Sequence, residues 1–190
     1  MRKLLFALII GLMPLSANAQ WAIGGGVELR EEDPETGVNI RIENELPFDV
    51  PFVKFRARLQ GTFFSEDISL GTTVQDDIEI NSFYAGANLL AEVGIPLPVN
   101  PYAGVGLGFE RLSFDEDAFS QISGGDNSDG SAYIDATVGL KVSLLPLIKP
   151  FAEYRFVEPF GDFDGLGNNA PSASALTANN RFVFGLLLQF

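Results

Sequence analysis

The sequence predicts an all-β fold, namely a transmembrane antiparallel up-and-down β-barrel of eight strands, and three observations predict it. Apolar and polar residues alternate along eight segments, a proline-rich phrase recurs three times, and the basic side chains gather on one face of the alternating segments. Aromatic residues make up 12% of the chain, whereas charged residues make up 19%. An ordinary soluble domain has about 25% charged residues, so this composition indicates a β-protein with an apolar surface.

Residues 1–19 are expected to be a signal peptide, and residues 20–190 the β-barrel domain. Two basic residues precede an apolar run at residues 4–12, and Ala17-Asn18-Ala19 has the small-residue pattern of an export cleavage site. The apolar run is about half of the ~20 residues that a helix needs to span a membrane, which argues against a helical anchor. We therefore expect the chain to be exported.

The composition excludes several kinds of function. The chain contains no His and no Cys, which excludes disulfides, zinc or haem sites of the usual kind and a His-based catalytic apparatus. We expect no cofactor, no metal and no enzymatic activity. The net charge of −13 argues against a nucleic-acid partner, because phosphate binding needs a basic face.

The proline-rich phrase divides the chain into repeating units. It occupies residues 46–52, 95–102 and 145–151. Proline cannot donate a hydrogen bond to a sheet, so each phrase predicts a short connection between two strands. Longer, polar and acidic loops alternate with these connections, at residues 65–77, 113–130 and 161–180. The molecule is therefore expected to have a short-turn end and a long-loop end.

Around these connections the hydrophobic period is two, which is typical of strands with one apolar face. In chain order, the apolar positions include Ile23, Val27 and Leu29; Val38, Ile40 and Ile42; Val53, Phe55 and Leu59; Ile134, Ala136 and Val138; and Phe182, Phe184 and Leu186. We expect strands at about residues 20–30, 37–45, 52–64, 78–93, 101–114, 131–145, 150–159 and 180–190. Because eight is an even number, both ends of the barrel domain should lie at the short-turn end.

The charges indicate which face of the strands meets water. Strands of about nine to eleven tilted residues match the apolar band of a membrane. Of the ten basic residues that follow the signal, eight lie on the polar face, and the apolar face carries almost no charge. A soluble lipocalin-like or sandwich domain would show the same period with its apolar face packed inward. Export and the unlike ends favour the membrane barrel, whose apolar face meets lipid and whose polar face lines the lumen.

The polar face is expected to form a packed luminal charge network, because the interior of an eight-stranded barrel is just wide enough for side chains to fill it. A glycine-rich fifth strand leaves space into which the bases of the third strand and Arg155 can extend. A structural salt-bridge plug is favoured over an anion-binding site or gate, since acids are available to neutralise the bases. The expected network comprises the bases Arg30, Arg41, Lys54, Arg56, Arg58, Lys141, Arg155 and Arg181 and the acids Glu28, Glu110, Asp135 and Glu153.

Three aromatic residues follow the proline-rich connections, namely Phe52, Tyr102 and Phe151. They lie on the inward parity, so they can cover the floor of the lumen. If the proline bend resets the alternation, they instead join Trp21 and Phe190 in an aromatic girdle at the membrane interface. The second interpretation is favoured.

At this point the chain resembles the small eight-stranded outer-membrane β-barrels of Gram-negative bacteria, of the OmpX and OmpA-transmembrane kind. The resemblance covers residues 20–190 and rests mainly on architecture. Its most specific element is the tail, which is similar to the C-terminal assembly signal of that family and comprises Phe182, Phe184, Leu186, Leu188 and Phe190. The resemblance implies a location in the cell outer membrane, with short turns in the periplasm and long loops outside. It also implies contact with outer-membrane lipid, lipopolysaccharide and, during biogenesis, the barrel-assembly machinery.

The functional hypothesis is a non-enzymatic outer-membrane barrel, a monomer with a side-chain-filled lumen. Its role would be envelope integrity or surface contact, with divalent cations bridging loop carboxylates to lipopolysaccharide phosphates. One alternative is a small channel or a carrier for hydrophobic molecules, as in OmpW-like barrels, although luminal charges of both signs argue against an apolar conduit. A more remote alternative is a soluble exported lipocalin-like binding protein.

Overall fold

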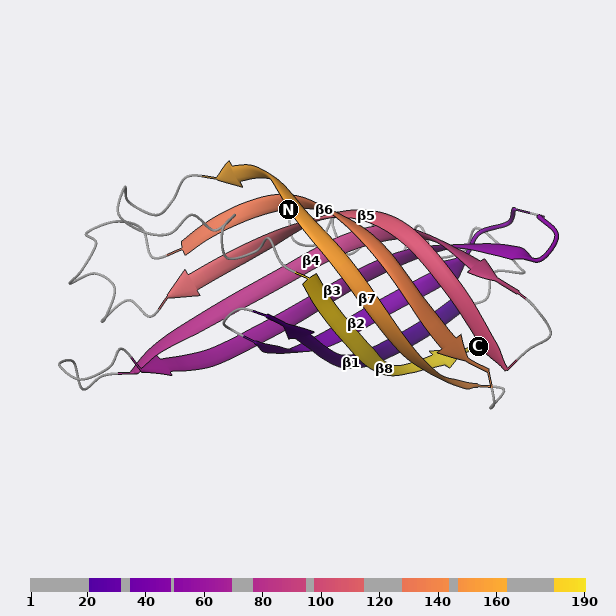
Figure 1. The fold of residues 1–190 in the computed structure, drawn as a ribbon, viewed down its shortest axis with the longest axis horizontal. Coiled ribbons are helices and arrows are strands. Elements are labelled where there is room, and N and C mark those ends of the chain that lie inside the picture. The colour runs from indigo at the N-terminus through magenta and orange to yellow at the C-terminus, as the bar shows by residue number, and fades with distance from the viewer. Residues whose placement is uncertain are drawn as a thin grey trace, which may run out of the picture.

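The computed structural model is a closed barrel in which each strand pairs antiparallel with its neighbours in sequence and β8 returns to β1 (Figure 1). The structure describes residues 21–31, 35–48, 50–69, 77–94, 98–114, 128–143, 147–163 and 180–190. The strands are β1 (Trp21–Arg30), β2 (Thr36–Glu45), β3 (Val53–Ser69), β4 (Asp77–Val93), β5 (Val99–Phe114), β6 (Ser128–Val142), β7 (Ile148–Phe163) and β8 (Asn180–Gln189). The predicted fold class and strand order are confirmed. The predicted signal peptide lies outside the described residues.

Several strands reach further than the sequence pattern predicts. β3 continues to Ser69 and β7 to Phe163, beyond the expected ends at residues 64 and 159. The added part of β3 pairs with the start of β4, from Ser65 opposite Asn81 to Ser69 opposite Asp77. The sequence there is mostly polar and acidic, so the hydrophobic period is lost, but a backbone ladder needs no side-chain pattern. No helix in the described ranges is long and apolar enough to cross a membrane.

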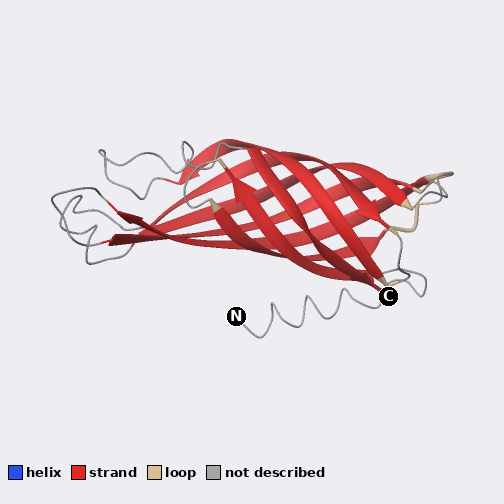
Figure 2. Ribbon diagram, turned by 60° about the horizontal axis from the view of Figure 1, so that its bottom comes forward, coloured by secondary structure: helices blue, strands red, loops and turns tan. Residues whose placement is uncertain are grey.

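Side chains alternate between the two faces of the barrel wall, with polar groups inside and apolar groups outside. On β2, Ile40 is 66% exposed, whereas its neighbours Asn39 and Arg41 are buried. The same alternation runs along the other strands, which cross the barrel at a steep tilt (Figure 2). A soluble protein has the reverse arrangement, with apolar groups inside. The outer wall therefore has the character that contact with lipid requires.

The seam between β1 and β8 depends on glycine, because the two backbones approach closely there. Gly26 lies opposite Gly185 in the seam. A Cβ atom at position 185 would meet the carbonyl oxygen of Gly25 and the Cα atom of Gly26 at distances that Cβ atoms do not adopt. Both obstacles are backbone atoms, so neither can move aside as a side chain can. The closing ladder therefore needs glycine at this position.

The structure corrects the favoured prediction for two of the three aromatic residues after the proline-rich connections. Tyr102 and Phe151 are buried in the lumen and do not join an outer girdle. The proline bend does not reset the alternation, because β5 and β7 begin before the prolines and keep their pairing through Pro101 and Pro150. Both rings therefore cover the lumen floor at the short-turn end, which was the other interpretation. Phe52 alone points outward.

Phe52 lies in a tight turn that joins β2 to β3. The amide of Val53 donates to the carbonyl oxygen of Val50 at 3.1 Å, which makes Pro51 and Phe52 the central residues of a β-turn. Phe52 has a φ of 63°, the sign that the third position of a type II turn requires and that glycine adopts most readily. For a residue with a side chain, this left-handed conformation costs roughly 1–2 kcal/mol.

A glycine exchange tests the seam. Gly185→Ala should prevent normal closure between β1 and β8, because its Cβ has no space among backbone atoms, and should leave little heat-resistant, fast-migrating barrel on an unboiled detergent gel. Gly61→Ala is the matched control, since a Cβ there meets nothing closer than 3.5 Å on the outer wall. It should change stability by no more than about 0.5 kcal/mol. Equal folding of the two variants would contradict the seam geometry.

Candidate functional site: a luminal ion-pair path

All eight bases of the predicted network point into the lumen, where they join carboxylates from other strands. Arg58, Arg155 and Arg181 are almost completely buried. Among the described residues, bases and acids alternate in one connected series that we call the ion-pair path. From the long-loop end to the short-turn end it comprises Arg30, Glu110, Arg181, Glu28, Arg155, Glu153, Arg58, Glu43, Lys141, Glu92, Arg56, Glu45 and Lys54, with Arg41 as a branch at Glu153.

At the long-loop end the path crosses from β5 to β1 and β8. Glu110 on β5 receives Arg30 at 2.6 Å and also pairs with Arg181. Arg181 continues to Glu28, with its Nη1 atom 3.3 Å from Oε1 of that carboxylate. Arg155 on β7 approaches the same Glu28 oxygen at 3.2 Å. Each carboxylate here therefore joins two guanidinium groups from different strands.

Glu153 on β7 is the central junction of the path. Its Oε1 atom accepts from Arg155 at 2.9 Å. Its Oε2 atom accepts from Arg41 at 3.2 Å, from the hydroxyl of Tyr102 at 2.8 Å and from Arg58. These donors come from β2, β3, β5 and β7, so one carboxylate connects strands on opposite sides of the barrel. Charge-assisted hydrogen bonds of this kind are stronger than those between neutral groups.

Toward the short-turn end, acids that sequence analysis did not select as partners continue the path. Glu43 receives Arg58 at 2.9 Å and Lys141 at 2.6 Å. Lys141 also lies 3.0 Å from Glu92. Strand parity places Glu43 and Glu92 on the inward face together with the expected partners, so their luminal position follows from the sequence. What parity does not supply is the pairing across the lumen, which depends on strand tilt and register.

The path ends at the rim, where it meets solvent. Arg56 pairs with Glu92 at 3.0 Å and with Glu45 at 2.9 Å. Lys54 then pairs with Glu45 at 3.2 Å, and its side chain is 44% exposed. The bases of β3 thus pair with neighbouring β2 and β4 at this end, while Arg58 reaches further to Glu153. Exposed pairs of the Lys54 kind contribute at most about 1 kcal/mol.

Asp135 departs from the prediction, because in the described part of the chain it joins no ion pair. Its Oδ1 atom accepts from Asn88 at 2.6 Å. Arg155 does not reach it, because two amide side chains lie between them. Arg155 donates to Gln60 at 2.8 Å, and Gln60 in turn donates to Asn88 at 2.7 Å. A neutral amide relay therefore connects Asp135 to the path.

Aromatic rings fill the lumen between the charged groups. The Arg30 guanidinium lies 3.9 Å from the ring centroid of Phe64, and that of Arg41 lies 4.0 Å from the centroid of Phe151. Tyr84 and Tyr133 stack with centroids 4.7 Å apart. A cation over an aromatic face is attracted by its quadrupole. Rings and ion pairs together occupy the lumen at each end.

The glycine-rich wall of β5 is filled differently from the prediction. The bases of β3 and Arg155 do not extend over it. A Cβ atom at Gly104 would collide with Leu90, one at Gly106 with Asn88, and one at Gly108 with the hydroxyl of Tyr133. These larger side chains come from the adjacent strands β4 and β6. The space beside each glycine is therefore filled by a side chain of a neighbouring strand.

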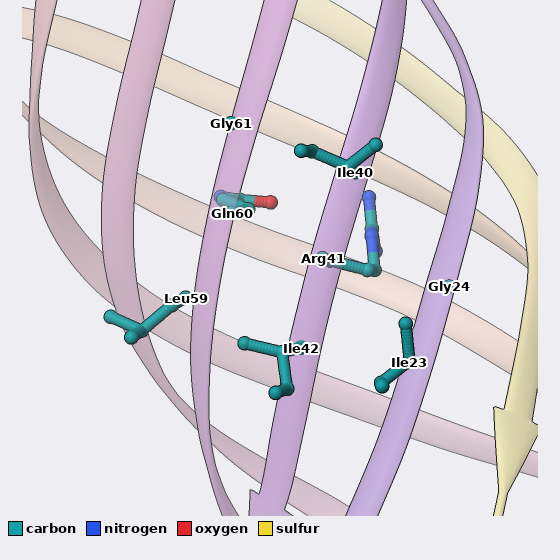
Figure 3. Close-up of a pocket in the computed structure, with 8 residues that line it drawn as sticks. All are labelled: Ile23, Gly24, Ile40, Arg41, Ile42, Leu59, Gln60 and Gly61. Carbon is teal, nitrogen blue, oxygen red and sulfur yellow. The ribbon is translucent and has the colours of Figure 1, made fainter. Parts of the chain in front are cut away.

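One hollow of about 470 Å³ lies on the outer wall, across β1, β2 and β3 (Figure 3). Branched aliphatic side chains surround it, and the missing side chain of Gly61 deepens it. Ile40 and Leu59 at its border are exposed, whereas Arg41 and Gln60 of the same strands are buried toward the lumen. The hollow therefore belongs to the apolar exterior and is separate from the ion-pair path. No group of acidic side chains in the described ranges is arranged to hold a metal ion.

Comparison with solved structures identifies the fold. No protein-family model and no curated protein sequence matches the chain. One match is Ail, the attachment invasion locus protein of Yersinia pestis, which was solved in complex with the heparin analogue sucrose octasulfate. It matches with a TM-score of 0.58 and 15% identity, over 90% of this chain and 97% of that chain. The chain has the fold of the small eight-stranded outer-membrane β-barrels.

Two further structures agree. A major outer membrane protein from Thermus thermophilus matches this barrel with a TM-score of 0.56 and 15% identity, over 91% of this chain and 100% of that chain. Neisserial surface protein A matches with a TM-score of 0.50 and 15% identity, over 90% and 97% of the two chains. The likeness concerns the fold, so the function of this barrel is argued from its own residues.

The central junction generates a stability prediction. Glu153→Gln keeps the shape of the side chain but removes the charge that Arg41, Arg58 and Arg155 share, so it should destabilise the barrel by about 3–5 kcal/mol. Glu45→Gln, the same exchange at the half-exposed rim, should cost less than about 1 kcal/mol. Urea unfolding in detergent, followed by tryptophan fluorescence, measures both. Similar losses in the two variants would show that the central junction has no special weight.

Proposed function

We propose that this chain is a non-enzymatic outer-membrane β-barrel with a closed lumen, which serves envelope integrity or surface contact. The observation that carries the proposal is the ion-pair path, which extends through the lumen with buried members between its ends. A buried path of this kind is a structural plug, since each base is already matched by a carboxylate. The apolar outer wall supports placement in a membrane.

The two unlike ends support one orientation in the outer membrane. The short connections lie at the same end of the barrel as the start of β1 and the end of β8, which is the arrangement of the short periplasmic turns in such barrels. The long connections at the other end would face outside. The predicted signal peptide accounts for export, and the outer wall accounts for contact with membrane lipid.

The channel and carrier alternatives receive less support. A carrier for hydrophobic molecules needs an apolar route, whereas charged side chains such as Arg155, Glu153 and Arg58 cross this lumen. The apolar hollow lies on the outside of the wall. Neither feature supplies a continuous conduit for ions or for apolar molecules.

The charge of the long-loop end suggests which ligands this barrel meets. Outside the lumen, almost all acidic residues lie along the sequence in or beside the connections of that end. The Yersinia protein above was solved with a heparin analogue, but like charges would repel such a polyanion here. We propose instead contact with lipopolysaccharide through divalent cations that bridge loop carboxylates and lipid phosphates.

A conductance measurement tests the closed lumen. The purified barrel, inserted into a planar bilayer, should give no steady single-channel current, because luminal side chains fill an eight-stranded interior. Insertion is checked separately by protease protection and by the shift of the unboiled band on a gel. Reproducible current steps of uniform size would reject the plug and favour a transport function.

The C-terminal stripe is proposed to act in assembly as well as in closure. Phe182, Phe184, Leu186, Leu188 and Phe190 are all exposed on the outer wall. Phe190 and Trp21 exchange two backbone hydrogen bonds, of 2.9 and 3.1 Å, across the seam. The stripe is thus continuous and accessible, as recognition by the barrel-assembly machinery requires.

Removal of Phe190 separates the two roles. Deletion should cost about 1 kcal/mol when the barrel refolds in detergent, because one interfacial aromatic is lost. In cells, the amount that reaches the outer membrane should fall further than this loss explains, if the tail is recognised. Trp21→Ala, directly across the seam, is the control and should show only the physical defect. Unchanged outer-membrane levels of both variants would end the recognition proposal.

A further inference from the structure

The ion-pair path contains more bases than acids. In the described part of the chain, eight basic side chains of the path share six carboxylates, which leaves two positive charges in excess. Every base of the path contacts a carboxylate, but contact alone does not balance the charge. Asp135, which is also buried in the lumen, would reduce the excess only to one. Net charge in a closed lumen is costly, because little water is present to solvate it.

One of the excess charges lies at the central junction. The unbranched part of the path begins with Arg30 and ends with Lys54, so it has one base more than acids, and water at the rim can solvate Lys54. The second excess base is Arg41, the branch of the path. Among the described residues its one carboxylate partner is Glu153, which two further guanidinium groups share. An uncompensated positive charge therefore lies deep in the barrel, at Arg41.

Two guanidinium groups at this junction each have an unused donor. Arg41 donates through Nε to Asn39 at 2.9 Å and through Nη1 to Glu153 at 3.2 Å. Arg58 donates through Nε to Glu43 at 2.9 Å and through Nη1 to the same oxygen of Glu153. The Nη2 atoms of both are buried, and no acceptor among the described residues lies within hydrogen-bond reach of either. Because both groups bind one oxygen, two positive groups with unused N–H donors lie close together.

Aromatic rings separate this junction from the short-turn end of the lumen. The ring centroid of Phe151 lies 4.0 Å from the guanidinium carbon of Arg41, and the hydroxyl of Tyr102 donates to Glu153. Arg41 and Arg58 are only 3% and 1% exposed, so bulk water does not reach their donors. Buried N–H groups in proteins normally have an acceptor. In surroundings of low dielectric constant, two guanidinium groups attract an anion much more strongly than they would in water.

We propose that the central junction binds one small inorganic anion of the halide class, held by the Nη2 donors of Arg41 and Arg58. A single negative charge there offsets the branch base and supplies an acceptor to both donors. A water molecule could accept the same two hydrogen bonds, but it has no charge to offset Arg41. The rings and side chains packed around the junction favour an ion of the size of chloride over a polyatomic oxyanion. The anion is a structural part of the plug, so the inference requires no open channel and does not depend on the membrane placement.

Unfolding in two salts tests the anion site. The barrel, residues 20–190, is refolded in detergent separately in sodium chloride and in sodium gluconate of equal ionic strength, so that a buried ion does not need to exchange. Urea unfolding, followed by tryptophan fluorescence, gives the equilibrium constant for folding in each salt. At a chloride concentration about ten times its Kd, this constant should be about tenfold higher than in gluconate, because the ion binds only the folded state.

Two variants separate the site from general salt effects. Arg41→Gln removes the excess base and one of the two donors, so the dependence on chloride should disappear. Arg111→Gln is the matched control, because Arg111 is exposed on the outward face of β5, and it should keep the dependence of the unmodified barrel. The site is refuted if the unmodified barrel responds to chloride no more than Arg41→Gln does, or if both variants lose the response equally.

Diffraction from the unmodified barrel gives a second measurement that does not require the variants to fold. Crystals grown in sodium bromide should show an anomalous peak within hydrogen-bond reach of Nη2 of both Arg41 and Arg58, because bromide takes the place of chloride and scatters anomalously. Density without an anomalous signal at this position would identify a buried water and overturn the proposal. Peaks confined to the outside of the barrel would show an adventitious ion only, which would overturn it as well.

Discussion

Pairing of buried charge is the constraint on which the rest of this barrel depends. An unpaired charge in a closed lumen costs several kcal/mol, so each guanidinium must meet a carboxylate from another strand. Glu153 shows how much one such group organises, since it holds Arg41, Arg58 and Arg155 in place together. A shift of one residue in the register of any of these strands would turn its charges into the outer wall. The network thus opposes register errors across the whole cylinder.

The outer wall has the character that lipid contact requires, and it depends on glycine at the seam and on apolar side chains instead of ion pairs. Close backbone approach at Gly26 and Gly185 closes the seam, and most exposed side chains of the wall are apolar. Because every strand edge is paired, the barrel offers no open ladder in its middle. The luminal charges therefore determine the strand register, and the apolar outer wall makes the barrel compatible with lipid.

The inward or outward direction of most side chains can be predicted from the sequence, because it depends only on the local alternation along one strand. The inward positions of Lys54, Arg56 and Arg58 follow directly from a period of two. The isolation of Asp135 is not local, since it results from the amides of Gln60 and Asn88 that meet in front of it. For Tyr102 and Phe151 the favoured outward placement was wrong and the inward alternative is correct, because β5 and β7 keep their pairing through Pro101 and Pro150. Parity is encoded along one strand, whereas contact across the lumen depends on the geometry of all eight.

The alternating order of the ion-pair path also governs how such a lumen can diverge. Glu43 serves both Arg58 and Lys141, so a reversal of its sign would set it against two bases. If Arg58 and Lys141 then changed to acids to restore these pairs, they would repel their other partners, Glu153 and Glu92. Luminal positions are therefore expected to change in linked groups during evolution, while residues of the outer wall exchange one at a time. Substitutions should be tolerated most easily at Lys54, because its side chain is partly exposed and water can solvate a charge that loses its partner.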